Sequence, residues 1–232
     1  METSLHRDLK RRYAGQRART EVVLDDYRID AVSGGQLIEI QHGSLAAIRD
    51  KIGRLVARHR VLVVKPIVRT KMLVKQPAPD GEAVSRRLSP KRGGLLDIFD
   101  ELVYFTRVFP HPRLAVEVVL VDVEEWRYPG HGRRRRWRRN DHVVADQKLI
   151  AVGASVRLCR PADLIKLLPA PLPAEFHTRA LAELCGVDRH AAQRIAYCLR
   201  EMRAVEPVGK QGNTLLYRLA RHKRRPSADD AA

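Results

Sequence analysis

The spacing of apolar and polar positions in the first 41 residues predicts a helix followed by three short strands. Residues 3–16 carry apolar side chains at helical spacing. Residues 20–32 form two extended segments joined by a turn of two aspartates, and residues 36–41 alternate as a strand does. The Gly34-Gly35 pair before this strand is typical of a tight hairpin connection, because glycine accepts positive φ.

The pattern then changes to a second helix and a longer buried strand. Residues 45–59 place apolar side chains on one side, with Ser44 as a suitable N-cap, and residues 60–68 contain a short continuous apolar run. Residues 75–94 are rich in Pro, Gly, Lys and Arg, which predicts a linker or a long surface loop. The order of elements up to this point predicts an α/β unit.

Further elements extend this unit. The sequence predicts a helix at 95–109 and strands at 114–126 and 143–158, whose aliphatic content places them in the same sheet. A second proline-marked connection covers residues 161–173.

The last part of the chain has the signals of two short helices and a strand pair. Thr178 can cap the first helix and Gly186 can end it, while Asp188 can cap the second helix. Helix, turn, helix and hairpin is an order similar to the winged helix-turn-helix. The predicted division is therefore an α/β core at 1–74, a basic extension at 75–160, a linker at 161–173, a winged helix-turn-helix at 174–222 and a disordered tail at 223–232.

Composition favours a polyanionic partner. The chain has 44 Lys and Arg against 27 Asp and Glu, a net charge of +17, which is typical of proteins that bind nucleic acid. Three cysteines without disulfide-like or zinc-like spacing indicate a reducing compartment. No apolar run is long enough for a leader or a membrane span. We therefore expect a cytoplasmic protein without a membrane partner.

Two carboxylates carry the candidate chemistry. Asp30 and Glu39 flank the Gly34-Gly35 turn, so a hairpin brings them together, and alternation puts Glu39 and Gln41 on one face. Oxygens arranged in this way favour Mg²⁺ (or Mn²⁺), which binds one or two carboxylates together with water and phosphate oxygens. Such an ion promotes phosphodiester hydrolysis. Ordinary solvated strand residues are the alternative interpretation of the same pair.

At these residues the chain resembles the PD-(D/E)XK nuclease superfamily, and more narrowly its competence protein CoiA-like branch. The resemblance covers residues 3–68 and implies a restriction-endonuclease-like αβββαβ core, with Asp30 and Glu39 as metal ligands. It places Gln41 where the usual lysine orients the attacking water, and it makes Glu21 an auxiliary acid. Glutamine is neutral and cannot supply the positive charge of a lysine, and Lys51 and Lys65 are the candidates to supply it instead. The sequence does not choose between these two lysines.

Basic and polar side chains elsewhere are candidates for DNA contact. A dense arginine run encloses a tryptophan that can stack on a base, and the second C-terminal helix and the hairpin tip present polar side chains that can contact DNA. The candidate residues are Arg133, Arg134, Arg135, Arg136, Trp137, Arg138, Arg139, His190, Gln193, Arg194, Tyr197 and Lys210.

These observations predict a Mg²⁺-dependent DNA endonuclease or DNA-processing nuclease, in which Asp30, Glu39 and Gln41 form the catalytic site. The alternative is a non-catalytic DNA-binding or regulatory protein on a degenerate nuclease fold, which the neutral Gln41 favours. RNA is the less favoured partner. A homodimer is compatible with the resemblance.

Overall fold

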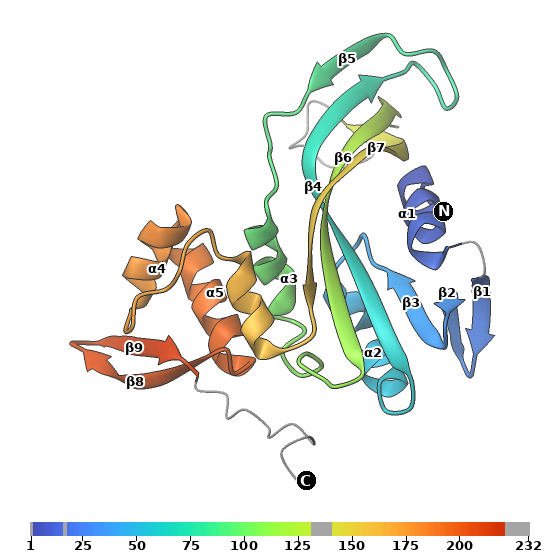
Figure 1. Ribbon diagram of the computed structural model, residues 1–232. Coiled ribbons are helices and arrows are strands. Elements are labelled where there is room, and N and C mark those ends of the chain that lie inside the picture. Colours follow the sequence, from blue (N-terminus) through green and yellow to red (C-terminus); the bar gives the residue numbers. More distant parts are fainter. Residues whose placement is uncertain (1, 16–17, 131–140, 221–232) are drawn as a thin grey trace.

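The computed structural model describes residues 2–15, 18–130 and 141–220. Within these residues the protein is a mixed α/β structure with a seven-stranded mixed sheet, a separate two-stranded hairpin and several helices. Figure 1 shows the long strands running through the middle of the molecule, with the N-terminal elements on one side and the C-terminal elements on the other.

The N-terminal elements follow the predicted order. They are α1 (Ser4–Ala14), β1 (Arg19–Leu24), β2 (Tyr27–Ser33), β3 (Gln36–Ile40), the 3-10 helix η1 (Leu45–Ile48), α2 (Arg49–Leu55) and β4 (Arg60–Lys75). Thr3 caps α1 and Ser44 caps η1, each by accepting a hydrogen bond from a main-chain N–H. Gly34 and Gly35 both have positive φ, as a tight hairpin requires.

The middle of the chain continues the same sheet. It consists of β5 (Ser85–Leu88), the 3-10 helix η2 (Leu95–Ile98), α3 (Phe99–Leu102), β6 (Leu114–Pro129) and β7 (His142–Leu158). The strand order is β1-β2-β3-β4-β6-β7, and β5 pairs with the far end of β4. Strands β3, β4 and β6 are parallel, and the other neighbours are antiparallel.

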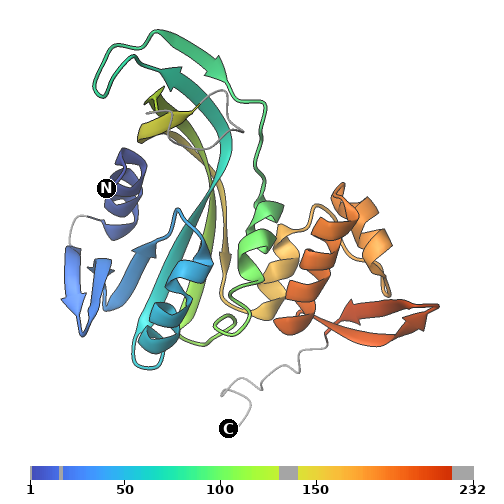
Figure 2. The same cartoon turned by 180° about the vertical axis from the view of Figure 1, so that it is seen from behind.

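Helices α1 and α2 lie on opposite faces of this sheet. Leu5 and Leu9 of α1 belong to an apolar cluster with Ile38 and Ile40 of β3. Ile52 and Leu55 of α2 belong to a different cluster, together with Leu37 and Ile29. The alternation along β3 therefore divides its side chains between two cores, as the period-2 pattern predicts. Figure 2 shows the molecule from behind, and in this view α2 lies in front of the long strands.

The C-terminal unit packs against this second core. It contains the 3-10 helix η3 (Pro161–Leu167), α4 (Thr178–Cys185), α5 (Arg189–Glu201), β8 (Val205–Gln211) and β9 (Thr214–Leu219). Phe176 forms an isolated bridge with Tyr217 of β9. Cys198 of α5 is buried against α3, with its Sγ 3.8 Å from the Phe99 carbonyl oxygen. The apolar cluster that contains α2 and α3 also contains α5, so it is continuous between the two parts.

Several local expectations differ from the structure. The segment predicted as a loop at 75–94 contains β5, because pairing with β4 supplies hydrogen bonds that a local pattern does not reveal. The two predicted long helices are short 3-10 and α segments that end at Leu55 and Leu102. His177, not Thr178, caps α4, because its Nδ1 accepts the N–H of Ala180.

The described residues contain no helix that is both long enough and apolar enough to cross a membrane. The disordered tail predicted at 223–232 lies outside the described residues.

Candidate functional site: two carboxylates and a basic groove

Asp30 and Glu39 lie where the pairing of β2 with β3 ends. The last pairs are Val32 with Leu37 and Ala31 with Ile38, so Asp30 and Glu39 occupy the next opposed positions. Here the Asp30 carboxylate replaces a main-chain partner, since its Oδ2 accepts the N–H of Ile40 at 2.8 Å. The sequence prediction that the hairpin brings these two positions together agrees with this register.

The Asp30 carboxylate is also held by α1. Its Oδ1 lies 3.1 Å from His6 Nε2. Burial works against the charge, but the His6 ring and the Ile40 amide hold the pKa of Asp30 below its ordinary value. The hydrogen bond to Asp30 raises the pKa of His6 in turn, against the effect of burial. The pair therefore favours an aspartate anion beside an imidazolium.

The pKa of Glu39 shifts in the direction opposite to that of Asp30. Its Oε1 lies 2.6 Å from Lys51 Nζ of α2, while its Oε2 is buried without a hydrogen-bond partner among the described residues. Burial raises the pKa of Glu39, and the charge of Asp30 raises it further, although Lys51 opposes both effects. The two carboxylates are thus electrostatically coupled.

Each carboxylate is approached from a different face of the sheet. His6 belongs to α1 and Lys51 belongs to α2, and these helices pack on opposite faces. Lys51 also donates to the Arg28 carbonyl oxygen at 2.6 Å, so it spans from β3 to β2. The candidate site therefore straddles the end of the β2–β3 ladder.

The structure separates the two lysines between which the sequence could not choose. Lys51 contacts Glu39, whereas Lys65 donates to the carbonyl oxygens of His42 and Gly43 and to Glu101 Oε1. Lys65 lies in the interior of β4, which continues to Lys75, and its side chain is buried there. Of the two lysines, Lys51 is therefore the one beside the candidate site.

Gln41 and Glu21 are each engaged elsewhere. The Gln41 side-chain amide donates to the Ser44 carbonyl oxygen at 2.8 Å, which ties it to the loop that follows β3. Glu21 has a φ of 54°, and its carboxylate is paired with Lys10 and Arg28. Among the described residues, neither side chain has a direct bond to Asp30 or Glu39.

The carboxylate oxygens of Asp30 and Glu39 suit a hard cation that takes most of its remaining ligands from water. The described residues hold no group of three or more His, Cys, Asp or Glu side chains that could bind a metal ion. Mg²⁺ commonly uses only one or two carboxylates and completes its shell with water and phosphate. The buried, unpartnered Oε2 of Glu39 is the observation that fits such an ion, because a buried oxygen without a partner is costly.

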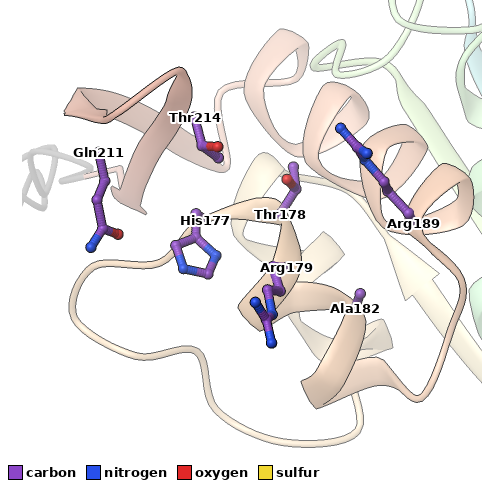
Figure 3. Close-up of a pocket in the computed structure, with 7 residues that line it drawn as sticks. All are labelled: His177, Thr178, Arg179, Ala182, Arg189, Gln211 and Thr214. Carbon is purple, nitrogen blue, oxygen red and sulfur yellow. The ribbon is translucent and has the colours of Figure 1, made fainter.

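A basic groove lies in the C-terminal unit between α4, α5 and the β8–β9 hairpin. It consists of adjoining cavities of about 480 and 290 Å³ that share Thr178, Arg189 and Thr214. Arg179 and Arg200 add further positive charge, and none of the described lining residues is acidic. Figure 3 shows side chains from both helices and from the hairpin around the larger cavity.

The residues predicted for DNA contact only partly coincide with this groove. Gln193 and Tyr197 line it, and His190 and Lys210 are exposed outside its lining. The Arg194 side chain is 40% exposed, and its Nε lies 2.6 Å from Asp100 Oδ1 of α3. The arginine run at 133–139 and Trp137 lie outside the described residues.

Sequence reasoning missed several groove residues, namely His177, Arg179, Arg189, Arg200 and Asn213. The sequence contains a signal for one of them, Arg189. Asp188 is the N-cap of α5, so Arg189 begins the helix and lies close to the end of the preceding helix. The others depend on how the hairpin folds back over α4 and α5.

The fold and these sites define a mixed α/β protein with a carboxylate pair in its sheet and a basic C-terminal groove. Residues 3–159 match the family described as Domain of unknown function (DUF8091), and the chain belongs to this family. It is 29% identical over 218 residues to an uncharacterized protein of Treponema pallidum (strain Nichols), covering 94% of this chain and 85% of the relative. No solved structure matches the chain.

The family match ends at Cys159, so it covers the sheet and both carboxylates but not the C-terminal unit. The alignment with the Treponema pallidum protein covers 94% of this chain and therefore extends into that unit.

Proposed function

We propose that the protein is a divalent-metal-dependent nuclease that hydrolyses phosphodiester bonds in DNA. The observation that carries this proposal is the pair of opposed carboxylates at the end of the β2–β3 ladder. One of them, Glu39, has a buried oxygen without a partner and a lysine 2.6 Å from its other oxygen. A site of this kind can accept a cation and a phosphate together.

The order of elements supports the same proposal. A helix, an antiparallel three-stranded meander, a helix and a parallel strand follow one another from α1 to β4. This order is similar to the αβββαβ core of PD-(D/E)XK nucleases. In such a core Asp30 and Glu39 stand on the neighbouring strands that carry the family's acidic residues.

The side chains can be given separate roles in this reaction. A bound divalent cation would neutralise the charge on the scissile phosphate and make water more acidic. Asp30 and Glu39 would hold that ion, and Lys51 would place positive charge beside Glu39. Gln41 is left to position the loop after β3, because its amide already donates to the Ser44 carbonyl oxygen.

The basic groove supplies a way to hold the substrate. The C-terminal order of two helices and a hairpin, with Phe176 bridged to Tyr217 as an added strand position, is similar to the winged helix-turn-helix. Arginines and neutral polar side chains in the groove suit phosphate and base-edge contacts. Binding there is expected to weaken as salt increases.

A plasmid cleavage assay tests the catalytic proposal directly. Cleavage by the wild-type protein should require Mg²⁺ or Mn²⁺, and Asp30→Asn and Glu39→Gln should each abolish it. Asp50→Asn is the matched control, because Asp50 is an exposed carboxylate on α2 that pairs with Arg49. If Asp30→Asn and Glu39→Gln cleave the plasmid as well as Asp50→Asn does, the assignment of Asp30 and Glu39 is refuted.

A second candidate function is DNA binding without hydrolysis. His6 lies beside Asp30 and Lys51 lies beside Glu39, so each carboxylate already has a cation from the protein itself. This observation favours a site that has lost its metal. Isothermal titration with Mg²⁺ separates the two candidates. Binding of Mg²⁺ that disappears in Glu39→Gln supports the nuclease, whereas DNA binding without any such metal binding supports the second candidate.

A further inference from the structure

A separate cavity of about 610 Å³ lies between β4, the segment that returns from β5, and α3. This volume is within the range of small-molecule sites, about 300–1,000 Å³. Its lining contains five lysines and arginines against three carboxylates: Lys65, Lys71, Lys91, Arg92 and Arg127 against Asp97, Asp100 and Glu101. Neither candidate carboxylate nor any groove residue is part of it.

A buried carboxylate holds two of these cations side by side. Glu125 is 3% exposed and accepts hydrogen bonds from Lys71 Nζ, from Arg127 Nε at 2.5 Å and from Gln147 Nε2 at 2.8 Å. An ammonium has three N–H donors and a guanidinium has five. Lys71 and Arg127 therefore keep free donors while Glu125 fixes their positions at the cavity wall.

The three carboxylates in the lining already have donors. Glu101 accepts from Lys65 and from Ser44 Oγ, and Asp100 accepts from Arg194. Asp97 accepts the main-chain N–H of Gly94. Their negative charge is therefore partly offset within the protein.

Three of the five lining cations pair with a carboxylate, whereas among the described residues Lys91 and Arg92 have no carboxylate partner. Within the described part of the chain, Arg92 donates only to the carbonyl oxygens of Ser89 and Lys91. His42, two residues after the end of β3, also lines the cavity. Burial, followed by the charges of Lys65 and Lys71, lowers the pKa of His42, so its ring stays neutral.

The lining also includes apolar residues. Pro66, Ile67 and Val68 of β4 line the cavity beside the cationic side chains. A bare phosphate would leave most of this volume empty, whereas a nucleotide would place its phosphate on the cations and its sugar and base in the remaining space. One guanidinium group can bind two phosphate oxygens through two parallel N–H donors. This geometry suits Arg92 and Arg127 as phosphate-binding residues.

We infer that this cavity is a nucleotide-binding site in which Lys71, Arg92 and Arg127 bind the phosphate group. The nucleotide is either free or part of a single strand, since both present the same chemistry. The site goes beyond the proposed nuclease and does not need a metal ion.

Isothermal titration of the full-length protein in EDTA tests this site, with three probes. The probes are deoxyadenosine monophosphate, a five-nucleotide single-stranded oligodeoxynucleotide and inorganic phosphate. Removing divalent ions keeps the result independent of Asp30 and Glu39. We expect at least one of the nucleotide probes to bind more tightly than inorganic phosphate, and Lys71→Gln and Arg92→Gln each to weaken that binding about tenfold.

Arg86→Gln is the matched control, because Arg86 pairs with Glu124 and does not line the cavity. Arg92 is exposed and its guanidinium donates to the carbonyl oxygens of Ser89 and Lys91, so Arg92→Gln stays informative if Lys71→Gln unfolds, which thermal unfolding would reveal. Binding of the monophosphate alone identifies a free nucleotide, and binding of the oligonucleotide alone identifies a strand. Absence of binding by both, equal binding of inorganic phosphate, or an equal loss in Arg86→Gln would overturn the inference.

Discussion

Replacement of Lys51 by methionine isolates the electrostatics of the Glu39 position. The ion pair is nearly buried, with side-chain exposed fractions of 16% for Lys51 and 11% for Glu39. Methionine keeps much of the aliphatic stem of lysine and removes its charge. The variant therefore leaves the Glu39 carboxylate buried without the cation that lies beside its Oε1.

The cost of this change has an upper limit, because Glu39 can escape its charge by binding a proton. Protonating a glutamate of pKa about 4.3 costs about 3.7 kcal/mol at pH 7 but only about 1 kcal/mol at pH 5. A broken buried ion pair typically costs about 3–5 kcal/mol. We therefore expect the free energy of unfolding to fall by about 3 kcal/mol at pH 7 and by about 1 kcal/mol or less at pH 5.

The sign of the pH dependence follows from proton binding. In the variant, folded Glu39 holds a proton at pH values where the unfolded chain has released it, so stability falls as pH rises from 5 to 7. Urea unfolding of wild type and variant at both pH values measures this difference. The double variant Glu39→Gln with Lys51→Met should recover most of the loss at pH 7. An equal loss at both pH values would show that packing, not charge, links Lys51 to the fold.

Other residues give simpler tests. His6→Gln should lower the free energy of unfolding more at pH 5.5 than at pH 8.5, because the raised pKa of His6 makes its contribution largest below its ordinary pKa and lost as pH rises; urea titrations at both values check this. Phe99→Ala should cost about 3–5 kcal/mol by urea unfolding, because Phe99 is 1% exposed between the sheet core and α5; a loss below about 1 kcal/mol would contradict a shared core. Gly186→Ala should cost about 1 kcal/mol in the same assay, since Gly186 ends α4 with a φ of 61°. Arg189→Gln should reduce the slope of log K against log salt for duplex DNA by about 0.9, and an unchanged slope would place Arg189 outside the interface.

Features fixed by short-range chemistry could be predicted from the sequence. The glycine pair between β2 and β3 and the caps formed by Ser44 and Asp188 depend on residues within a few positions of one another. The opposition of Asp30 and Glu39 follows from the same hairpin. These features required no knowledge of the tertiary structure.

Features that depend on distant pairing could not be predicted. β5 lies in a segment rich in proline and arginine, and it is a strand only because the far end of β4 is available to pair with it. The choice between Lys51 and Lys65 depends on α2 bringing Lys51 to Glu39 and on the loop after β3 and Glu101 surrounding Lys65, and the local sequence pattern indicates neither contact. The ion pair of Arg194 with Asp100 could not be predicted either, because only the tertiary fold brings α3 to α5.

The short helix α3 has a consequence for the evolution of this chain. Its neighbouring residues Asp100 and Glu101 face different partners: Asp100 binds Arg194 of α5, while Glu101 accepts hydrogen bonds from Ser44 Oγ and the Leu45 N–H just beyond β3. A recombination event that replaced the C-terminal unit alone would sever the first contact and expose the buried side of α3. Moving α3 together with the unit would instead sever the contacts of Glu101, so an exchanged C-terminal unit must carry its own cation at the position of Arg194 and apolar side chains that fit α3.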